Sequence, residues 1–336
     1  MRVVFVLTVF MLANAANGIV AQADDAAMRL GPALAQLRDF ARGQGEKIWP
    51  GYGMAPFGFL LIGSTQETLL CRDDVPDGFV AAGRDAATGC TRYTRPRSGL
   101  PDTLLAAMPL FGPPTTIVMG TPRTTGRSAA DWLRTILHEH FHQWQMNLPD
   151  YFARSEALDL KRDAADSTWM LDYPFPYEAK SPRRAYARAS RALADALAAR
   201  GTPRLADAFA RFIRARMDFA ARVSARDWRY LEYEQWFEGA ARWTEIALGK
   251  IYPDAAVRDA AATLERRTLE QLRTPDMARQ RRELVYPFGA GEFLLLDACD
   301  TDWRSRYTAQ MSLAPLLDAA LARCQTRKAG PSPAAD

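Results

Sequence analysis

The sequence predicts an α+β protein in which a small N-terminal β-sheet precedes a long helical region. Short apolar and β-branched runs alternate with Pro, Gly and Asp up to about residue 122, whereas helical spacing of apolar residues dominates after Ser128. Strands followed by helices, with no repeat period between them, predict one unit rather than two. We therefore expect a single domain at 24–327, with a β-rich part at about 46–122 and a helical part at about 128–325.

The composition is typical of a globular protein and argues against nucleic-acid binding. Hydrophobic residues make up 48% of the 336 residues and charged residues 24%, which are ordinary proportions. The net charge is only +4, and the arginines are scattered among alanines, as on solvated helix faces. Because no concentrated basic stripe is present, we expect no nucleic-acid partner.

The first 23 residues have the pattern of a signal peptide. Arg2 precedes a short apolar run at 3–12, and an A-x-A cleavage site ends at Ala23, with an earlier alternative at Ala15. The run is too short to span a bilayer comfortably, although an uncleaved anchor is the alternative. We expect an exported protein, periplasmic or secreted, with no stable membrane span after cleavage.

An exported protein folds where disulfides can form, so the four cysteines are candidates for pairing. They are Cys71, Cys90, Cys299 and Cys324. Four cysteines allow three pairings, and proximity favours Cys71–Cys90 and Cys299–Cys324. Each pair would close a loop of roughly 20–25 residues, worth about 3 kcal/mol in the chain-entropy model. Four free buried thiols are the alternative.

The N-terminal part is expected to contain one helix and several short strands. Apolar residues at helical spacing predict a helix over 26–43, where glycines follow. Short apolar or β-branched runs between turn residues predict strands at 57–62, 68–71, 79–82, 91–93 and 115–119. The last of these could act as an edge strand that pairs with an extended peptide.

The rest of the chain is expected to be helical. Helical spacing between proline-containing breaks predicts helices at 129–147, 182–200, 203–223, 227–249, 254–272, 288–299 and 311–324. The tail at 328–336 is expected to be disordered. Within the segment 150–227, four aromatic residues next to prolines either wall a cleft or pack a loop: Trp169, Tyr173, Phe175 and Tyr177.

All three histidines of the chain lie within five consecutive residues, and they form an H-E-x-x-H motif of His138, Glu139 and His142. On a helix, residues i and i+4 share a face, so both imidazoles can bind one ion while Glu139 reaches a water on that ion. A helix is expected because Ser128 caps it and an apolar stripe follows. His140 points away from the pair and is expected to pack or to form hydrogen bonds. A plain helix with no metal is the alternative.

The third metal ligand has to be acidic, because catalytic zinc usually takes three protein ligands and no histidine remains. Glu234, Glu238 and Glu245 share one face of the helix predicted at 227–249. Glu238 is the best candidate because small residues follow it, from Gly239 on, and these allow another helix to approach. Glu234 as the ligand, or an ordinary exposed acidic face, are the alternatives.

These motifs resemble those of the gluzincin metallopeptidases, the clan of thermolysin and the thermolysin-like aminopeptidases. The matching features are the H-E-x-x-H motif, an E-G-x-A segment at 238–241 and a further glutamate seven residues after the first. The resemblance implies a zincin-like catalytic region with one Zn²⁺ ion bound by His138, His142 and Glu238.

The resemblance also implies roles for residues around the ion. Glu139 would be the general base, and Glu245 would orient a ligand histidine. Related enzymes place a tyrosine that steadies the oxyanion at a distance after the third ligand that matches Tyr286. Tyr230 and Tyr233 compete with Tyr286 for that role.

The sequence therefore predicts an exported zinc metallopeptidase acting on peptide or protein substrates. A zinc-binding protein without turnover, a zinc hydrolase of a non-peptide amide and a helical interaction protein without metal are the alternatives. An intact Glu139 argues against the first of these, because metal binding alone needs no base. The clustering of the histidines argues against the last.

Overall fold

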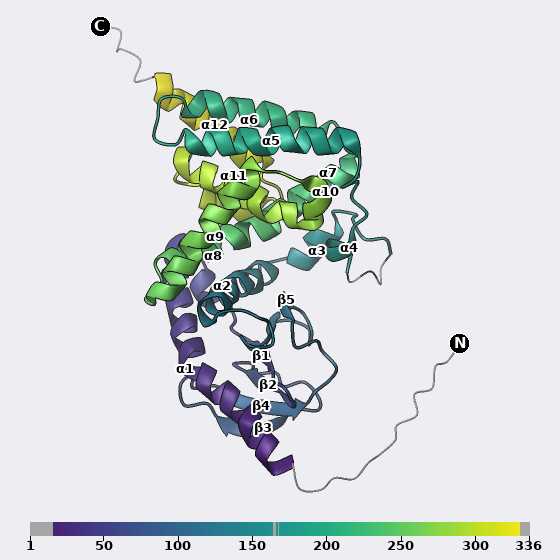
Figure 1. Cartoon of the computed structure of the whole chain (residues 1–336), viewed down its shortest axis with the longest axis vertical. Coiled ribbons are helices and arrows are strands. Elements are labelled where there is room, and N and C mark those ends of the chain that lie inside the picture. The colour runs from purple at the N-terminus through teal and green to yellow at the C-terminus, as the bar shows by residue number, and fades with distance from the viewer. Residues whose placement is uncertain (1–15, 164–165, 167, 330–336) are drawn as a thin grey trace.

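The computed structural model describes residues 16–163, 166 and 168–329, and it confirms the α+β prediction. A six-stranded sheet lies at one end of the elongated molecule, and α5 and α6 lie at the other (Figure 1). Helix α2 lies between them. The first 15 residues of the predicted signal peptide and residues 330–336 of the predicted tail are outside the described residues.

The elements follow one another as a sheet and then a helical region. The strands are β1 (Phe59–Ile62), β2 (Gln66–Leu70), β3 (Val80–Arg84), β4 (Thr91–Pro96), β5 (Leu105–Met108) and β6 (Thr116–Gly120). The longer helices are α1 (Ala16–Ile48), α2 (Ala129–Met146), α5 (Lys180–Ala198), α6 (Leu205–Ala220), α7 (Ala225–Glu234), α8 (Ala240–Lys250), α9 (Ala255–Arg273), α11 (Val285–Cys299) and α12 (Ala314–Ala329). The shorter ones are η1 (Tyr52–Met54), α3 (Tyr151–Glu156), α4 (Trp169–Asp172), η2 (Gln235–Gly239), α10 (Met277–Gln280), η3 (Arg281–Leu284) and η4 (Trp303–Ala309).

The strand order in the sheet is β3-β4-β2-β1-β6-β5, and it corrects the expectation that the strand predicted at 115–119 is an edge. That strand is β6, which pairs in parallel with β1 and in antiparallel with β5. All five residues of β6 are buried. The edge on that side of the sheet is β5, whose sequence Leu-Ala-Ala-Met has no β-branched residue and therefore gave no strand signal.

Helix α11 is the centre of the helical region. It packs against α5, α8, α9 and α12, and almost every residue in it is buried. Its sequence is mostly apolar, with Glu292 and Asp297 as exceptions, as expected of a helix that is covered on most sides. The helix predicted at 227–249 is interrupted: α7 leads into the five-residue π-helical turn η2, and α8 continues from it.

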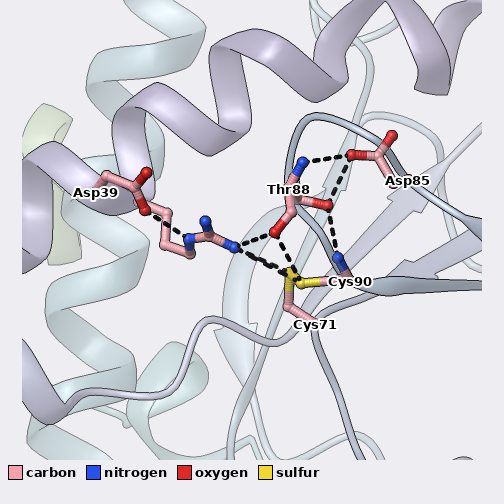
Figure 2. The surroundings of a disulfide bond; sticks show 6 residues. Asp39, Cys71, Asp85, Thr88 and Cys90 are labelled. Atoms are coloured by element: carbon pink, nitrogen blue, oxygen red, sulfur yellow. Dashed lines mark hydrogen bonds and ion pairs between the residues drawn. A yellow bond between two sulfur atoms is a disulfide. The ribbon is translucent and has the colours of Figure 1, made fainter.

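Both favoured disulfides are present, Cys71–Cys90 and Cys299–Cys324. The first joins the end of β2 to the loop before β4. Figure 2 shows the hydrogen bonds between α1 and the surroundings of this disulfide. The Nη1 of Arg38 donates a 2.7 Å hydrogen bond to the carbonyl oxygen of Thr88, and Asp85 receives hydrogen bonds from the amide and hydroxyl of Thr88. Two disulfides suit a chain that folds in an oxidising compartment.

None of the helices within the described part of the chain is both long enough and apolar enough to cross a bilayer.

Candidate metal centre

The histidine motif lies in the buried part of α2. The helix begins after Ser128, whose Oγ accepts the backbone N–H of Asp131 at 3.1 Å, so the predicted cap is present. His138, Glu139 and His142 are at most 7% exposed. The two histidines are one helical turn apart and therefore direct their rings to the same side.

Two imidazole nitrogens and one carboxylate oxygen meet at a single point. The Nε2 atoms of His138 and His142 are 3.1 Å apart, and Oε2 of Glu238 lies 3.2 Å from the first and 3.1 Å from the second. Bonds of about 2.0–2.2 Å to a tetrahedrally coordinated ion place neighbouring donor atoms about 3.3–3.6 Å apart. The observed triangle is close to that size, so these three residues could hold a metal ion.

Hydrogen-bonding partners on the far side of each ring aim the Nε2 atoms at this point. Nδ1 of His138 lies 3.3 Å from Oε2 of Glu245, and Nδ1 of His142 lies 2.7 Å from Oε1 of Gln145. Both oxygens only accept hydrogen bonds, so each Nδ1 carries a proton, and a ring that holds no second proton presents an Nε2 lone pair to the common point. Lone pairs that face one another beside a carboxylate repel unless a cation lies among them. The donor set therefore fits a divalent cation.

The buried charges around the donors favour a positive charge at the same point. Burial alone would lower the pKa of His138, but hydrogen bonds to Glu238 and Glu245 outweigh it and raise the pKa to about 10. Burial would raise the pKa of Glu238, yet His142 and Arg282 hold it well below its usual range. A proton and a metal ion compete for such a site.

Glu245 has the position expected of a residue that orients a ligand histidine. Burial would raise its pKa, but Arg134 and His138 lower it to about 2, so the carboxylate is ionised. Arg134 forms a close ion pair with Glu245, and Arg242 approaches Oε2 of the same residue to 3.2 Å. The two arginines therefore balance the charge of this buried carboxylate, which still faces Nδ1 of His138.

Glu238 lies in the π-helical turn η2, a form that is rare and frequent at functional sites. The turn brings Glu238 to the histidines, whereas Glu234 does not reach them. The carboxylate of Glu234 instead lies 2.7 Å from Nη2 of Arg282. Burial raises the pKa of Glu234 to about 8. Of the two alternatives for the third ligand, the geometry favours Glu238.

Arg282 is a residue of the site that the sequence did not indicate. Its Nη2 donates to Oε1 of Glu238 at 2.7 Å, which leaves Oε2 to face the histidines. Its Nη1 donates to the hydroxyl of Tyr286 at 3.1 Å, and its Nε donates to the carbonyl oxygen of Met170 at 2.8 Å. Arg282 lies in η3, and only the tertiary fold brings it to η2, so no local spacing could have revealed it.

Glu139 lies on the cavity side of the donors. Its Oε2 accepts the backbone N–H of Ala107 in the edge strand β5 at 2.8 Å. Burial is the main cause that raises the pKa of Glu139. The carboxylate is therefore held beside the donor atoms but is not one of them.

Tyr286 is the best placed of the three candidate tyrosines. Its ring lies over that of His138, with 6.0 Å between the centroids, and it lines the same cavity as Glu139. The hydroxyl of Tyr230 instead donates to the carbonyl oxygen of Met170 at 3.0 Å. Tyr233 also lines the cavity, but its hydroxyl pairs with another tyrosine at 2.6 Å.

His140 has the structural role expected of it. Its ring nitrogens lie 2.9 Å from the hydroxyl of Tyr52 and 3.1 Å from the carbonyl oxygen of Pro56. Burial lowers its pKa to about 3, so the ring is neutral.

A cavity of about 650 Å³ opens beside the donor atoms. One wall is formed by residues 105–110, which include β5, and another by α3, α4 and η2. Of the aromatic residues expected at a cleft wall or in a loop, Trp169 lines this cavity. Tyr173 does not line it and instead stacks on Tyr230, with the centroids 4.1 Å apart.

Comparison of the chain with protein-family models, curated proteins and solved structures gave no significant match.

Proposed function

We propose that the chain is an exported zinc-dependent metallopeptidase of the gluzincin type, which hydrolyses peptide or protein substrates. The observation that carries this proposal is the triangle of His138, His142 and Glu238 donor atoms with the carboxylate of Glu139 beside it on one cavity. The order of these residues along the chain resembles that clan, which supports the same proposal.

Zinc is the metal that this donor set favours. Two neutral imidazoles and one carboxylate are the ligands of many catalytic zinc sites, in which the fourth position remains open. When bound, zinc supplies Lewis acidity, which lowers the pKa of a coordinated water and polarises a carbonyl group.

The residues of the chain would then handle the protons and the charge. Glu139 accepts a proton from the attacking water and delivers it to the leaving amine. Tyr286 donates a hydrogen bond to the carbonyl oxygen as negative charge develops there. Because Arg282 already donates to the oxygen of Tyr286, the hydroxyl hydrogen of that tyrosine is free to point elsewhere.

The test of this proposal is metal content and peptide hydrolysis in matched variants. We expect about one zinc per wild-type chain, and loss of that zinc in Glu238→Ala. Glu234→Gln is the matched control, because Glu234 is equally buried and contacts the same arginine but offers no donor atom. Glu139→Gln should retain zinc and lose activity by a factor of about 10²–10⁴.

Each of the other results contradicts part of the proposal. Failure to bind zinc, even after purification without chelators and addition of the metal, would exclude the metal centre. Zinc binding without hydrolysis of any peptide would leave a zinc-binding protein without turnover. Hydrolysis of non-peptide amides alone would make the chain a zinc amidase.

A further inference from the structure

The cavity beside the candidate metal centre is mainly apolar. Large apolar side chains from α2, α3, α4 and η2 line it: Met146, Phe152, Trp169, Met170, Leu171 and Phe237. Phe152 is 43% exposed and Leu171 67% exposed, so apolar surface continues to the entrance of the cavity. Cavities lined in this way hold apolar groups, and a few placed polar groups fix their orientation.

Three charged side chains that line the cavity outside the metal-donor set, Glu156, Lys161 and Asp166, are already in ion pairs. Glu156 accepts a 2.9 Å hydrogen bond from Lys161, and Asp166 accepts one of 2.8 Å from Arg162. A substrate that placed a free terminus against these groups would have to compete with bonds that exist already.

The charged groups deeper in the cavity are also committed. Arg282 donates to Glu238, to Tyr286 and to a backbone carbonyl, and it lies 2.7 Å from Glu234. Glu139 is beside the donor atoms and accepts a backbone N–H. Among the described lining residues, therefore, every charged side chain outside the metal-donor set already has a partner, and none offers an unpaired charge to a terminal ammonium or carboxylate group.

We infer that the substrate is cut inside a chain, next to a large apolar or aromatic side chain that enters this cavity. This inference rests on the proposed function. The reaction is hydrolysis: the carbonyl carbon gains the hydroxyl of water, the C–N bond breaks, and the leaving nitrogen gains the proton. The residues at 105–110 run along the cavity, so an extended chain can lie beside edge strand β5 and continue past both sides of the cut.

The experiment compares internally quenched peptides with the zinc-loaded protein. One set has blocked ends and carries Phe, Leu, Ala or Glu beside the cut, and a second set repeats these peptides with free ends. We expect kcat/KM to be at least about tenfold higher for blocked Phe and Leu peptides than for blocked Ala and Glu peptides. Blocking the ends should not reduce the rate.

A matched pair of variants ties this preference to the cavity. Leu171→Glu places a charge at its entrance and should lower kcat/KM for the Phe peptide by about tenfold, with less than about a threefold change for the Ala peptide. Met217→Glu is the control, because Met217 is 66% exposed on α6 and does not line the cavity. It should change neither rate.

The possible failures are distinguishable. If only peptides with a free end are hydrolysed, or if Glu peptides are preferred, the inference is wrong and the proposed function stands. If nothing is hydrolysed, the proposed function fails, and the inference about cutting fails with it. Binding of the blocked peptides to Glu139→Gln, measured by fluorescence anisotropy, gives a readout without turnover. Equal affinity for the Phe and Ala peptides would overturn the apolar recognition.

Discussion

At the scale of single residues, Gln145 connects α2, which carries the two histidines, with η2, which carries Glu238. Its Oε1 accepts from His142, and its Nε2 donates to the carbonyl oxygen of Phe237 at 3.1 Å and to the hydroxyl of Tyr307 at 2.6 Å. One buried amide thus orients His142, a candidate ligand, and holds the backbone next to Glu238. We expect Gln145→Leu to lower zinc affinity by about 10–100-fold, measured by competition with a chelator.

Gln143 provides the control for this prediction. Its amide is equally buried on α2, but it donates to the carbonyl oxygens of Gly58 and Thr115 instead of a ligand. Gln143→Leu should therefore lower stability and leave zinc affinity unchanged. Equal loss of zinc affinity in both variants would mean that the effect comes from the packing of α2 and not from orientation of His142.

Tyr286 allows a second prediction at this scale. Replacement by Phe removes only the hydroxyl, so zinc content should be retained while kcat falls by about 10²-fold, the usual effect of a lost oxyanion donor. Steady-state kinetics should show the change in kcat and little change in KM. An unchanged kcat would mean that Tyr286 packs against its neighbours and takes no part in the reaction.

The sequence indicated the residues that lie within recognisable motifs, including Glu238 in its E-G-x-A segment, and missed Arg282 and Gln145, which lie in no motif. His138, Glu139 and His142 are fixed by helical spacing, which the chain shows directly. Arg282 reaches the centre only because η3 lies against η2, and nothing in its neighbourhood indicates this. Gln145 could have been found, because it lies three residues after His142 and helical geometry places such pairs side by side.

At the scale of elements, a close contact between two helices sets the position of Glu238. A Cβ atom added at Gly239 would lie 2.6 Å from the Cα of Gly289, so α11 packs directly on η2. The small residues after Glu238 were expected to admit another helix, and at Gly239 that helix is α11. The π-helical turn was not predictable, because its amino acids are compatible with an uninterrupted α-helix.

Gly289→Ala tests this contact. The new methyl group would lie 2.7 Å from the carbonyl oxygen of Gln235, which is backbone and cannot rotate away. We expect the free energy of unfolding to fall by about 1–3 kcal/mol and zinc affinity to fall with it, because η2 carries Glu238. Urea denaturation and a zinc titration measure the two effects.

Gly291→Ala is the matched control on the same helix. Its methyl group would meet only the ends of the Leu272 and Leu193 side chains, at 2.8 and 2.9 Å, and these can shift. The loss of stability should be smaller and zinc affinity unchanged. If Gly291→Ala costs as much stability and zinc affinity as Gly289→Ala, the contact with η2 is not what positions the ligand.

At the scale of the whole molecule, a buried cluster of one arginine and two glutamates links α6, α7 and α11. Arg216 on α6 donates to Oε1 of Glu292 on α11 at 2.7 Å and forms a close ion pair with Glu232 on α7. Glu232 also accepts from Ser312, just before α12, at 2.6 Å. One guanidinium thus faces two carboxylates in the interior, where an uncompensated charge is costly.

This imbalance predicts a pH dependence of stability. Burial raises the pKa of Glu292 to about 7, and Arg216 offsets the shift only in part. Between about pH 4.5 and pH 7 the folded protein holds a proton that the unfolded chain has released, so this group stabilises the fold at low pH and its contribution is lost as pH rises. Glu292→Gln keeps an acceptor for Arg216 and removes the titration.

The contribution of Glu292 is measured as the difference in unfolding free energy between wild type and Glu292→Gln at pH 5 and at pH 8. Both proteins are unfolded with urea in the presence of a chelator, so that proton competition at the metal centre affects them equally. Relative to the variant, the wild type should lose on the order of 2–3 kcal/mol between the two pH values. Parallel pH profiles would show that Glu292 is ionised in the folded protein throughout, with Arg216 fully compensating its burial.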